Sequence, residues 1–181
     1  MSARVLDGKA LAETIRAEVR AGVEAFQIRS GRSPGLDVVL VGEDPASVIY
    51  TRNKEKASTE VGIRGKLHRL PASTSDEELG ALLGALNADP RVDGILVQFP
   101  LPAHIDAQRA VDRIDADKDV DGFHPINAGR LALARPGALA PPTPAGCMRL
   151  LELSGVELTG AHAVILGRSN LVGRPLSLIH I

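Results

Sequence analysis

The sequence predicts an α/β fold in which a parallel sheet is followed by the start of a second α/β unit. Apolar runs typical of strands alternate with helix patterns along most of the chain, which is the order that parallel sheets with crossover helices require. A stretch rich in proline and glycine, residues 136–144, predicts a domain boundary. We therefore expect one domain over residues 1–140 and the beginning of another over residues 141–181.

Three short segments are expected to form the strands of the sheet, at residues 36–41, 66–70 and 94–99, and the first and third are largely apolar. The first contains the nearly continuous run Val38–Val41, as expected for a strand covered by helices on both faces. In such sheets ligands bind beyond the carboxyl ends of the strands. Gln98 stands at one of these ends, and we expect it to converge with the helix entered from another.

The helices between the strands carry start and stop signals. Asp44 can cap a helix whose first residue is Pro45, and Gly62 suits the position past its end. In this segment Ile49, Ala57 and Val61 stand at spacings that could face a core. Other helices are expected after Asp7, after the Ser75–Glu78 capping box, over residues 106–114 and over residues 145–154.

The composition excludes several classes of function. Lys and Arg number 21 and Asp and Glu 22, so no basic excess indicates a nucleic-acid partner. Cys147 is the only cysteine, which excludes an internal disulfide, and the five histidines lack metal-ligand spacing. No apolar run approaches the ~20 residues of a membrane span, so we expect no membrane partner and a cytoplasmic protein.

Four carboxylates alternate over a short span: Asp115, Asp117, Asp119 and Asp121. Lys118 interrupts the series and no Glu closes it, so the pattern departs from a calcium-binding EF-hand loop. A solvated turn is the expected role of most of these groups. For Asp121 a functional role and a solvated turn stay equally open, and we expect His124 to be a structural hydrogen-bonding group.

The pair Tyr50 and Lys54 is the strongest local indication of chemistry. Four residues apart on a helix, the two side chains share one face. An aromatic ring can stack on a flat heterocycle, and an amine beside it can move a proton. The ordinary alternative, a half-buried ring next to a solvated charge, is more common for such a pair taken alone.

A second pattern lies near the end of the chain. Residues 161–166 are expected to form a strand, and Gly167–Pro175 then resembles a glycine-rich turn leading into a helix, which can hold a nucleotide phosphate. The turn departs from G-x-G-x-x-G, so an ordinary tight turn is about as good an interpretation. Arg168 and Arg174 could meet a 2′-phosphate, which favours NADP over NAD.

Taken together, five ordered blocks carry a resemblance that runs from about Leu6 to Ser177. The blocks are Val41–Ser47 with Tyr50 and Lys54, Asp93–Pro102, Asp117–Pro125, Pro142–Gly146, and Gly167–Pro175. The chain is similar to the bifunctional methylenetetrahydrofolate dehydrogenase/methenyltetrahydrofolate cyclohydrolase family. That family acts in one-carbon metabolism, which serves purine biosynthesis.

The resemblance implies a catalytic domain, a Rossmann-like NADP-binding domain, and tetrahydrofolate derivatives bound in the cleft between them. By position, Tyr50 then stacks on the aminobenzoate ring, Lys54 is the general acid/base, Gln98 orients Lys54, and Asp121 accepts hydrogen bonds from the pterin. The implied substrate contacts are Tyr50, Lys54, Val97, Gln98, Phe99, Pro100 and Asp121. The implied cofactor contacts are Gly167, Arg168, Ser169, Gly173 and Pro175, and no metal is expected.

The residue types suit the implied chemistry. Hydride leaves the one-carbon bridge of methylenetetrahydrofolate for NADP, and water then adds to the methenyl cation, whose ring opens to the formyl derivative. Water addition and ring opening need proton transfers, which Lys54 can supply near neutral pH where desolvation favours its uncharged form.

Members of the family continue beyond Ile181, so the resemblance implies a C-terminally truncated chain whose full-length form is a homodimer. Residues 178–181 do not follow the family's apolar continuation. One alternative is therefore a folate-binding fragment with little or no dehydrogenase activity. Another is an unrelated α/β nucleotide-binding module, which has no need of the set formed by Tyr50, Lys54, Gln98 and Asp121.

Overall fold

The computed structural model describes residues 5–179, so His180 and Ile181 at the expected divergent ending lie outside it. The chain divides into two compact units. The first, here called the sheet unit, is Arg16–Val120, and the second unit joins Met1–Ile15 to Asp121–Ile181. Each is described by itself, and the expected boundary near residue 140 stays a prediction. Within residues 5–179, no helix combines the length and the apolar character needed to cross a membrane.

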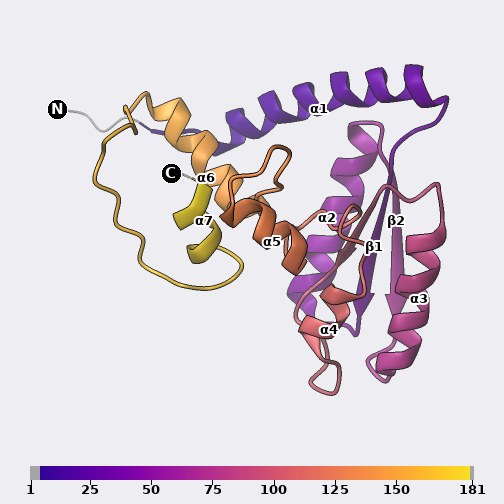
Figure 1. Cartoon of the computed structure of the whole chain (residues 1–181). Helices are drawn as coiled ribbons and strands as arrows, with labels where there is room; N and C mark the ends of the chain where they lie inside the picture. Colours follow the sequence, from indigo (N-terminus) through magenta and orange to yellow (C-terminus); the bar gives the residue numbers. More distant parts are fainter. Residues whose placement is uncertain (1–4, 180–181) are drawn as a thin grey trace. The chain divides into compact units, whose positions relative to one another are not determined.

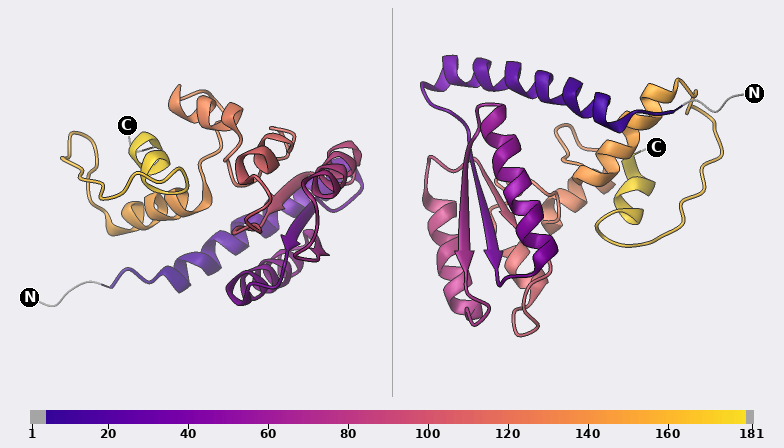
Figure 2. Two further views of the ribbon diagram at one scale, coloured as in Figure 1. Left: turned by 90° about the horizontal axis from the view of Figure 1, so that it is seen from below. Right: turned by 180° about the vertical axis from the view of Figure 1, so that it is seen from behind.

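The sheet unit contains the predicted parallel sheet. Its strands are β1 (Gly35–Val41), β2 (Arg64–Leu70) and β3 (Gly94–Val97), in the order β2-β1-β3 with both pairs parallel. Helices α2 (Pro45–Glu60) and α3 (Asp76–Ala88) cover opposite faces of this sheet (Figures 1 and 2). The α/β fold with a buried central strand is therefore confirmed.

One face of the sheet forms the main apolar core together with α3 and α4 (Ala107–Asp112). Alternate residues of β1 and β3 point to the same face because side chains alternate along a strand. The core consists of Val39, Val41, Leu79, Leu83, Leu86, Val92, Ile95, Val97, Ile105, Ala110 and Ile114. The predicted capping box starts α3, with the Ser75 hydroxyl accepting from Glu78 N and the Glu78 carboxylate accepting from Ser75 N.

Helix α2 covers the other face with small side chains. Its buried residues are Ser47, Thr51 and Ser58, and the Thr51 hydroxyl donates to the carbonyls of the preceding turn. The expectation that Ile49 faces a core was wrong, since it is 60% exposed. A helix that buries residues 47, 51 and 58 turns residue 49 toward the opposite side, while Val61, just beyond the helix, is buried as expected.

The ends of α2 agree with the sequence signals. The Asp44 carboxylate accepts from Ser47 N at 2.8 Å, and Pro45 begins the helix. Gly62 follows with a φ of 87°, a conformation that favours glycine. A Cβ there would also lie 3.1 Å from Val23 in α1 (Gly8–Ser30), a tight contact that glycine avoids.

An ion pair with an additional backbone hydrogen bond, here called the clamp, joins the beginnings of two strands. The Arg32 guanidinium donates to both carboxylate oxygens of Asp93, at 2.6 and 2.7 Å, and Gly35 N donates to the same carboxylate at 2.7 Å. These hydrogen bonds, led by that from Arg32, hold the pKa of Asp93 below its usual value. The clamp fixes the start of β1 next to the residue that precedes β3.

The second unit contains α5 (Pro125–Ala132), α6 (Pro142–Ser154) and α7 (Gly173–Ile179), and α7 contacts both of the others. Helix α5 was not expected from the sequence. Its start could have been recognised from Pro125 at the first position, preceded by His124, whose Nδ1 accepts from Ile126 N at 3.2 Å. The structural role expected for His124 is thus confirmed.

The strand expected over residues 161–166 is wrong, because this stretch has no regular secondary structure. A parallel strand is held by hydrogen bonds to a neighbouring strand. In the described part of the chain, the only named strands are the three of the sheet unit. Val164 and Leu166 are accordingly 72% and 95% exposed.

Candidate functional site

The predicted pair lies on α2, near the carboxyl edge of the sheet. Tyr50 is 62% exposed, so its ring is accessible for stacking. Lys54 is half-buried one turn further along the same helix. The close approach of α2 follows from its small buried residues, which let the helix backbone lie near the strands.

The expected convergence of Lys54 and Gln98 is confirmed. The Lys54 ammonium donates to Gln98 Oε1 at 3.1 Å. Gln98 comes directly after β3, and its own N–H donates to Val39 O at 2.8 Å, which continues the strand ladder by one residue. The amide that faces the lysine is therefore held by the rigid end of a strand.

The orientation of the Gln98 amide follows from its second hydrogen bond. Its Nε2 donates to the Phe99 carbonyl at 2.8 Å, and a carbonyl can only accept. The amide nitrogen must therefore face Phe99, which leaves the oxygen facing the amine of Lys54. An acceptor at this position fixes the direction of one N–H bond of the amine.

Ser47 supports the same arrangement and was not singled out from the sequence. Its hydroxyl donates to the Phe99 carbonyl at 3.3 Å, while its backbone N–H donates to Asp44. The hydrogen bond from Ser47 N is the main cause that holds the pKa of Asp44 below its usual value. The spacing between the capping Asp44 and Ser47 was a usable signal, because it places Ser47 on the first turn beside the strand ends.

The other predicted substrate contacts near this strand end are the sequence neighbours of Gln98. Val97 is the last residue of β3 and is buried, so it supports the strand end from within the core. Phe99 is half-buried and Pro100 is exposed, and the peptide bond between them is cis. The exposed surface at this strand end thus belongs mainly to residues 98–100.

Asp121 is the first residue of the second unit and is half-buried. The segment before it is anchored in the sheet unit by Lys118. Its ammonium donates to three carbonyls at and just beyond the end of α3, Leu86 O, Asn87 O and Asp89 O, at 2.7–3.1 Å. Asp119 is buried beside β3, which corrects the expectation of a solvated turn for that residue. No group of three or more metal-ligating residues that could hold an ion occurs among residues 5–179.

The predicted cofactor residues form a tight loop in the second unit. Gly167, Arg168 and Ser169 are exposed, whereas Gly173 and Pro175 are buried. Ser169 Oγ accepts from Val172 N at 3.1 Å, which closes the turn. A Cβ on Gly173 would overlap the Gly167 carbonyl, which explains why glycine stands there.

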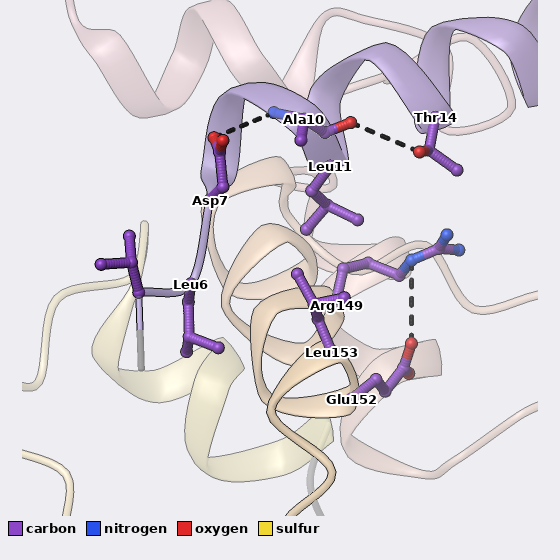
Figure 3. Close-up of a pocket in the computed structure, with 9 residues that line it drawn as sticks. Leu6, Asp7, Ala10, Leu11, Thr14, Arg149, Glu152 and Leu153 are labelled. Carbon is purple, nitrogen blue, oxygen red and sulfur yellow. Dashed lines mark hydrogen bonds and ion pairs between the residues drawn. The ribbon is translucent and has the colours of Figure 1, made fainter. Parts of the chain in front are cut away.

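A separate hollow of about 490 Å³ lies between the start of α1 and α6 (Figure 3). Its walls are largely apolar, with Leu6, Leu11 and Leu153, and the Arg149–Glu152 ion pair of 3.7 Å borders it. None of the predicted site residues lines this hollow.

Family models match most of the chain. Residues 6–121 match the model of the tetrahydrofolate dehydrogenase/cyclohydrolase catalytic domain, and residues 141–180 match that of the NAD(P)-binding domain of the same family. The bifunctional protein FolD of Sorangium cellulosum is 63% identical over 177 residues, which cover 98% of this chain and 62% of that relative. The FolD protein of Oleidesulfovibrio alaskensis is 53% identical, with 97% and 61% covered.

Solved structures give the same result. The bifunctional FolD dehydrogenase/cyclohydrolase of Campylobacter jejuni is 44% identical with a TM-score of 0.93, covering 98% of this chain and 62% of that one. The enzyme of Trypanosoma brucei, solved with NADP cofactor and an inhibitor, is 37% identical with a TM-score of 0.94, covering 99% and 62%. The chain thus spans about three-fifths of the length of these relatives.

Proposed function

We propose a function from the premise that this chain belongs to the tetrahydrofolate dehydrogenase/cyclohydrolase family. The protein takes part in the oxidation of methylenetetrahydrofolate with NADP and in the hydrolysis of the resulting methenyl cation to formyltetrahydrofolate. The observation that carries this proposal is the hydrogen bond between the Lys54 ammonium and Gln98 Oε1 at the end of β3. It supports the proposal because an amine held by an oriented acceptor lies at the edge of a parallel sheet, where ligands bind.

Lys54 moves the protons of the hydrolytic half. Water adds to the electrophilic methenyl carbon and loses a proton, and one ring nitrogen takes up a proton as its bond to that carbon breaks. A single amine can do both in turn, provided that it loses its charge for part of the cycle. Gln98 keeps the amine aimed at the reacting carbon, and a folate stacked on Tyr50 would exclude water around it.

The remaining contacts follow the family's arrangement. Tyr50 stacks on the aminobenzoate ring, and Val97, Phe99 and Pro100 shape the surface beside Gln98. Asp121 accepts hydrogen bonds from the amino edge of the pterin. An ionised carboxylate suits that edge because it accepts hydrogen bonds and donates none.

NADP supplies the hydride acceptor when bound. The loop residues suit an anionic cofactor, because Gly167, Arg168 and Ser169 are exposed and no hydrogen bond or ion pair of the Arg168 side chain occurs within the described residues. Gly173 and Pro175 then maintain the tight turn that presents these groups. We assign the catalytic domain to residues 1–140 and the beginning of the cofactor domain to residues 141–181.

In the cell we propose a cytoplasmic enzyme of one-carbon metabolism, serving purine biosynthesis, whose longer form is a homodimer. No nucleic-acid or membrane partner is part of this proposal.

A second candidate is a folate-binding unit with little or no dehydrogenase activity. It is favoured by the irregular stretch 161–166, since a cofactor loop normally follows a strand that fixes its position. The Lys54–Gln98 geometry does not depend on that stretch, so the hydrolytic half can persist where hydride transfer fails.

Two absorbance assays test the proposal. One follows the loss of methenyltetrahydrofolate, the other the reduction of NADP by methylenetetrahydrofolate. Both are run on this chain and on an extended form, in which the rest of the Sorangium cellulosum relative is joined after Ser177. We expect the extended form to show both activities. If it neither reduces NADP nor hydrolyses the methenyl compound, the proposed function is wrong; hydrolysis by this chain without NADP reduction favours the second candidate.

A further inference from the structure

We propose that His104 is a substrate-positioning residue, which holds the loop after Gln98 in the shape that receives the folate. The inference rests on the proposed function and adds to it a residue outside the five sequence blocks that carry the resemblance. His104 lies four residues beyond Pro100, in the loop that connects β3 to α4. This loop follows a strand at the carboxyl edge of the sheet, the edge at which Lys54 and Gln98 meet.

His104 forms a bond between two loops. Its Nε2 lies 2.8 Å from the Thr74 carbonyl, in the turn that follows β2. Because a carbonyl only accepts, Nε2 carries the hydrogen, and the imidazole is either the Nε2–H tautomer or the imidazolium. Both forms donate, so this link does not depend on the protonation of the ring. Thr74 is itself buried and its N–H donates to Pro71 O at 3.0 Å, so the acceptor is fixed.

The rest of the loop explains why this link matters. At one end the Phe99 carbonyl is held by Gln98 and Ser47. At the other end Ile105 is buried in the core, and its N–H donates to Pro102 O at 2.9 Å. Between these two anchors, His104 supplies the hydrogen bond that ties the loop to the neighbouring turn. Leu101 also packs against the core, so without this link residues 102–104 are the part of the loop that can move away from the turn.

Because of its location, His104 can be truncated with little effect on the stability of the fold. Its side chain is exposed, so truncating it leaves no buried cavity, unlike the replacement of a core residue. The link joins two connections at the carboxyl edge and no element of the apolar core. Its loss should therefore change the conformation of the loop and leave the free energy of unfolding nearly unchanged.

The test compares three variants: His104→Ala, His104→Gln, whose amide nitrogen can replace Nε2 as donor, and His162→Ala, an exposed histidine used as control. The affinity for methenyltetrahydrofolate is measured on this chain, and KM and kcat for its hydrolysis on the extended form. Hydrogen exchange of the Ile105 amide reports on the loop, with the amides of β1 as reference. We expect His104→Ala to raise Kd and KM about 3- to 10-fold, the size of one hydrogen bond, with kcat unchanged and faster exchange at Ile105. His104→Gln and His162→Ala should match the parent.

Unchanged Kd and KM in His104→Ala, despite faster exchange at Ile105, would overturn the inference while leaving the proposed function intact. So would an equal loss in His104→Gln, or a fall in kcat at constant KM. If the parent chain and the extended form both fail to bind methenyltetrahydrofolate, the proposed function fails and this inference falls with it.

Discussion

The corner formed by α2 and the end of β3 differs from the loop at residues 167–173 in what holds it. In the corner, Lys54 and Gln98 are placed by a helix packed on a sheet and by a strand paired with its neighbour. The loop follows an irregular stretch, and local contacts such as the Ser169 cap and the Gly173 approach to Gly167 give it its shape. Side chains on a packed helix and at the end of a paired strand are held at a fixed separation. In a loop that no strand precedes, only the local turn is fixed.

This difference implies that the two halves of the proposed reaction depend on different parts of the chain. Proton transfer needs groups that are within this sheet unit. In the proposed function, hydride transfer needs a cofactor held by the loop of the second unit. Substitutions in the corner should therefore reduce hydrolysis, and substitutions in the loop should reduce NADP binding alone. A loop substitution that also impairs hydrolysis would contradict this separation.

The largest effect is expected for Lys54→Met, which keeps the length of the side chain and removes the amine. Hydrolysis of methenyltetrahydrofolate by the extended form should fall about 10²- to 10⁴-fold, the usual contribution of a general acid/base. Binding of the same compound should change little. The rate is followed by absorbance, and Lys56→Met, an exposed lysine one half-turn further on, is the control. Equal losses in the two variants would remove Lys54 from the mechanism.

Gln98→Leu should have the next largest effect. It leaves the amine in place but removes the oxygen that orients it, so we expect the hydrolysis rate to fall about 10- to 100-fold. Thermal unfolding of the same variant distinguishes lost orientation from lost structure. A normal rate in a normally folded variant would show that the hydrogen bond to Lys54 has no role in turnover.

Gly173→Ala addresses the other region. The added Cβ overlaps the Gly167 carbonyl, so the loop must open and NADP affinity should fall about tenfold or more. Hydrolysis in the sheet unit should be unaffected. The matched control is Gly146→Ala in α6, where a Cβ meets no atom within 4 Å. Titration of the extended form with NADP gives both affinities, and a hydrolysis defect in Gly173→Ala would contradict the separation of the two regions.

Much of the sheet unit could be predicted because its signals are local. Strand runs, the Asp44 cap and the Ser75–Glu78 box each define an element without reference to distant residues. The convergence of Lys54 and Gln98 followed from the rule that parallel strands end at one edge. The contribution of Ser47 did not, because it depends on a carbonyl contributed by a residue 52 positions away.

The errors have physical causes of the same kind. Residues 161–166 have the composition of a strand, but a strand forms only with a partner, and composition does not report one. Ile49 was misplaced because α2 packs with serine and threonine, which an apolar periodicity does not count. Helix α5 was missed because its signal, a capping histidine before a proline, is less usual than a serine or aspartate cap.

A smaller effect, on stability alone, is expected at Asp93. Arg32 holds the pKa of this carboxyl below its unfolded-state value of about 3.9. The ionised form therefore stabilises the fold above that pH, and the contribution is lost as the pH falls through the lower folded-state pKa. Asp93→Asn should reduce the free energy of unfolding at pH 7, with a difference from the parent that narrows in acid. Urea titrations across this range measure it, and a difference that does not vary with pH would contradict the assignment.

The most direct test of the central claim is a double-mutant cycle on Lys54 and Gln98, read as the hydrolysis rate of methenyltetrahydrofolate by the extended form. If Gln98 acts by orienting the amine, the combination of Lys54→Met and Gln98→Leu should be no slower than Lys54→Met alone. If the two losses multiply, the residues act independently, and the view that the end of β3 aims the proton-transfer group is wrong.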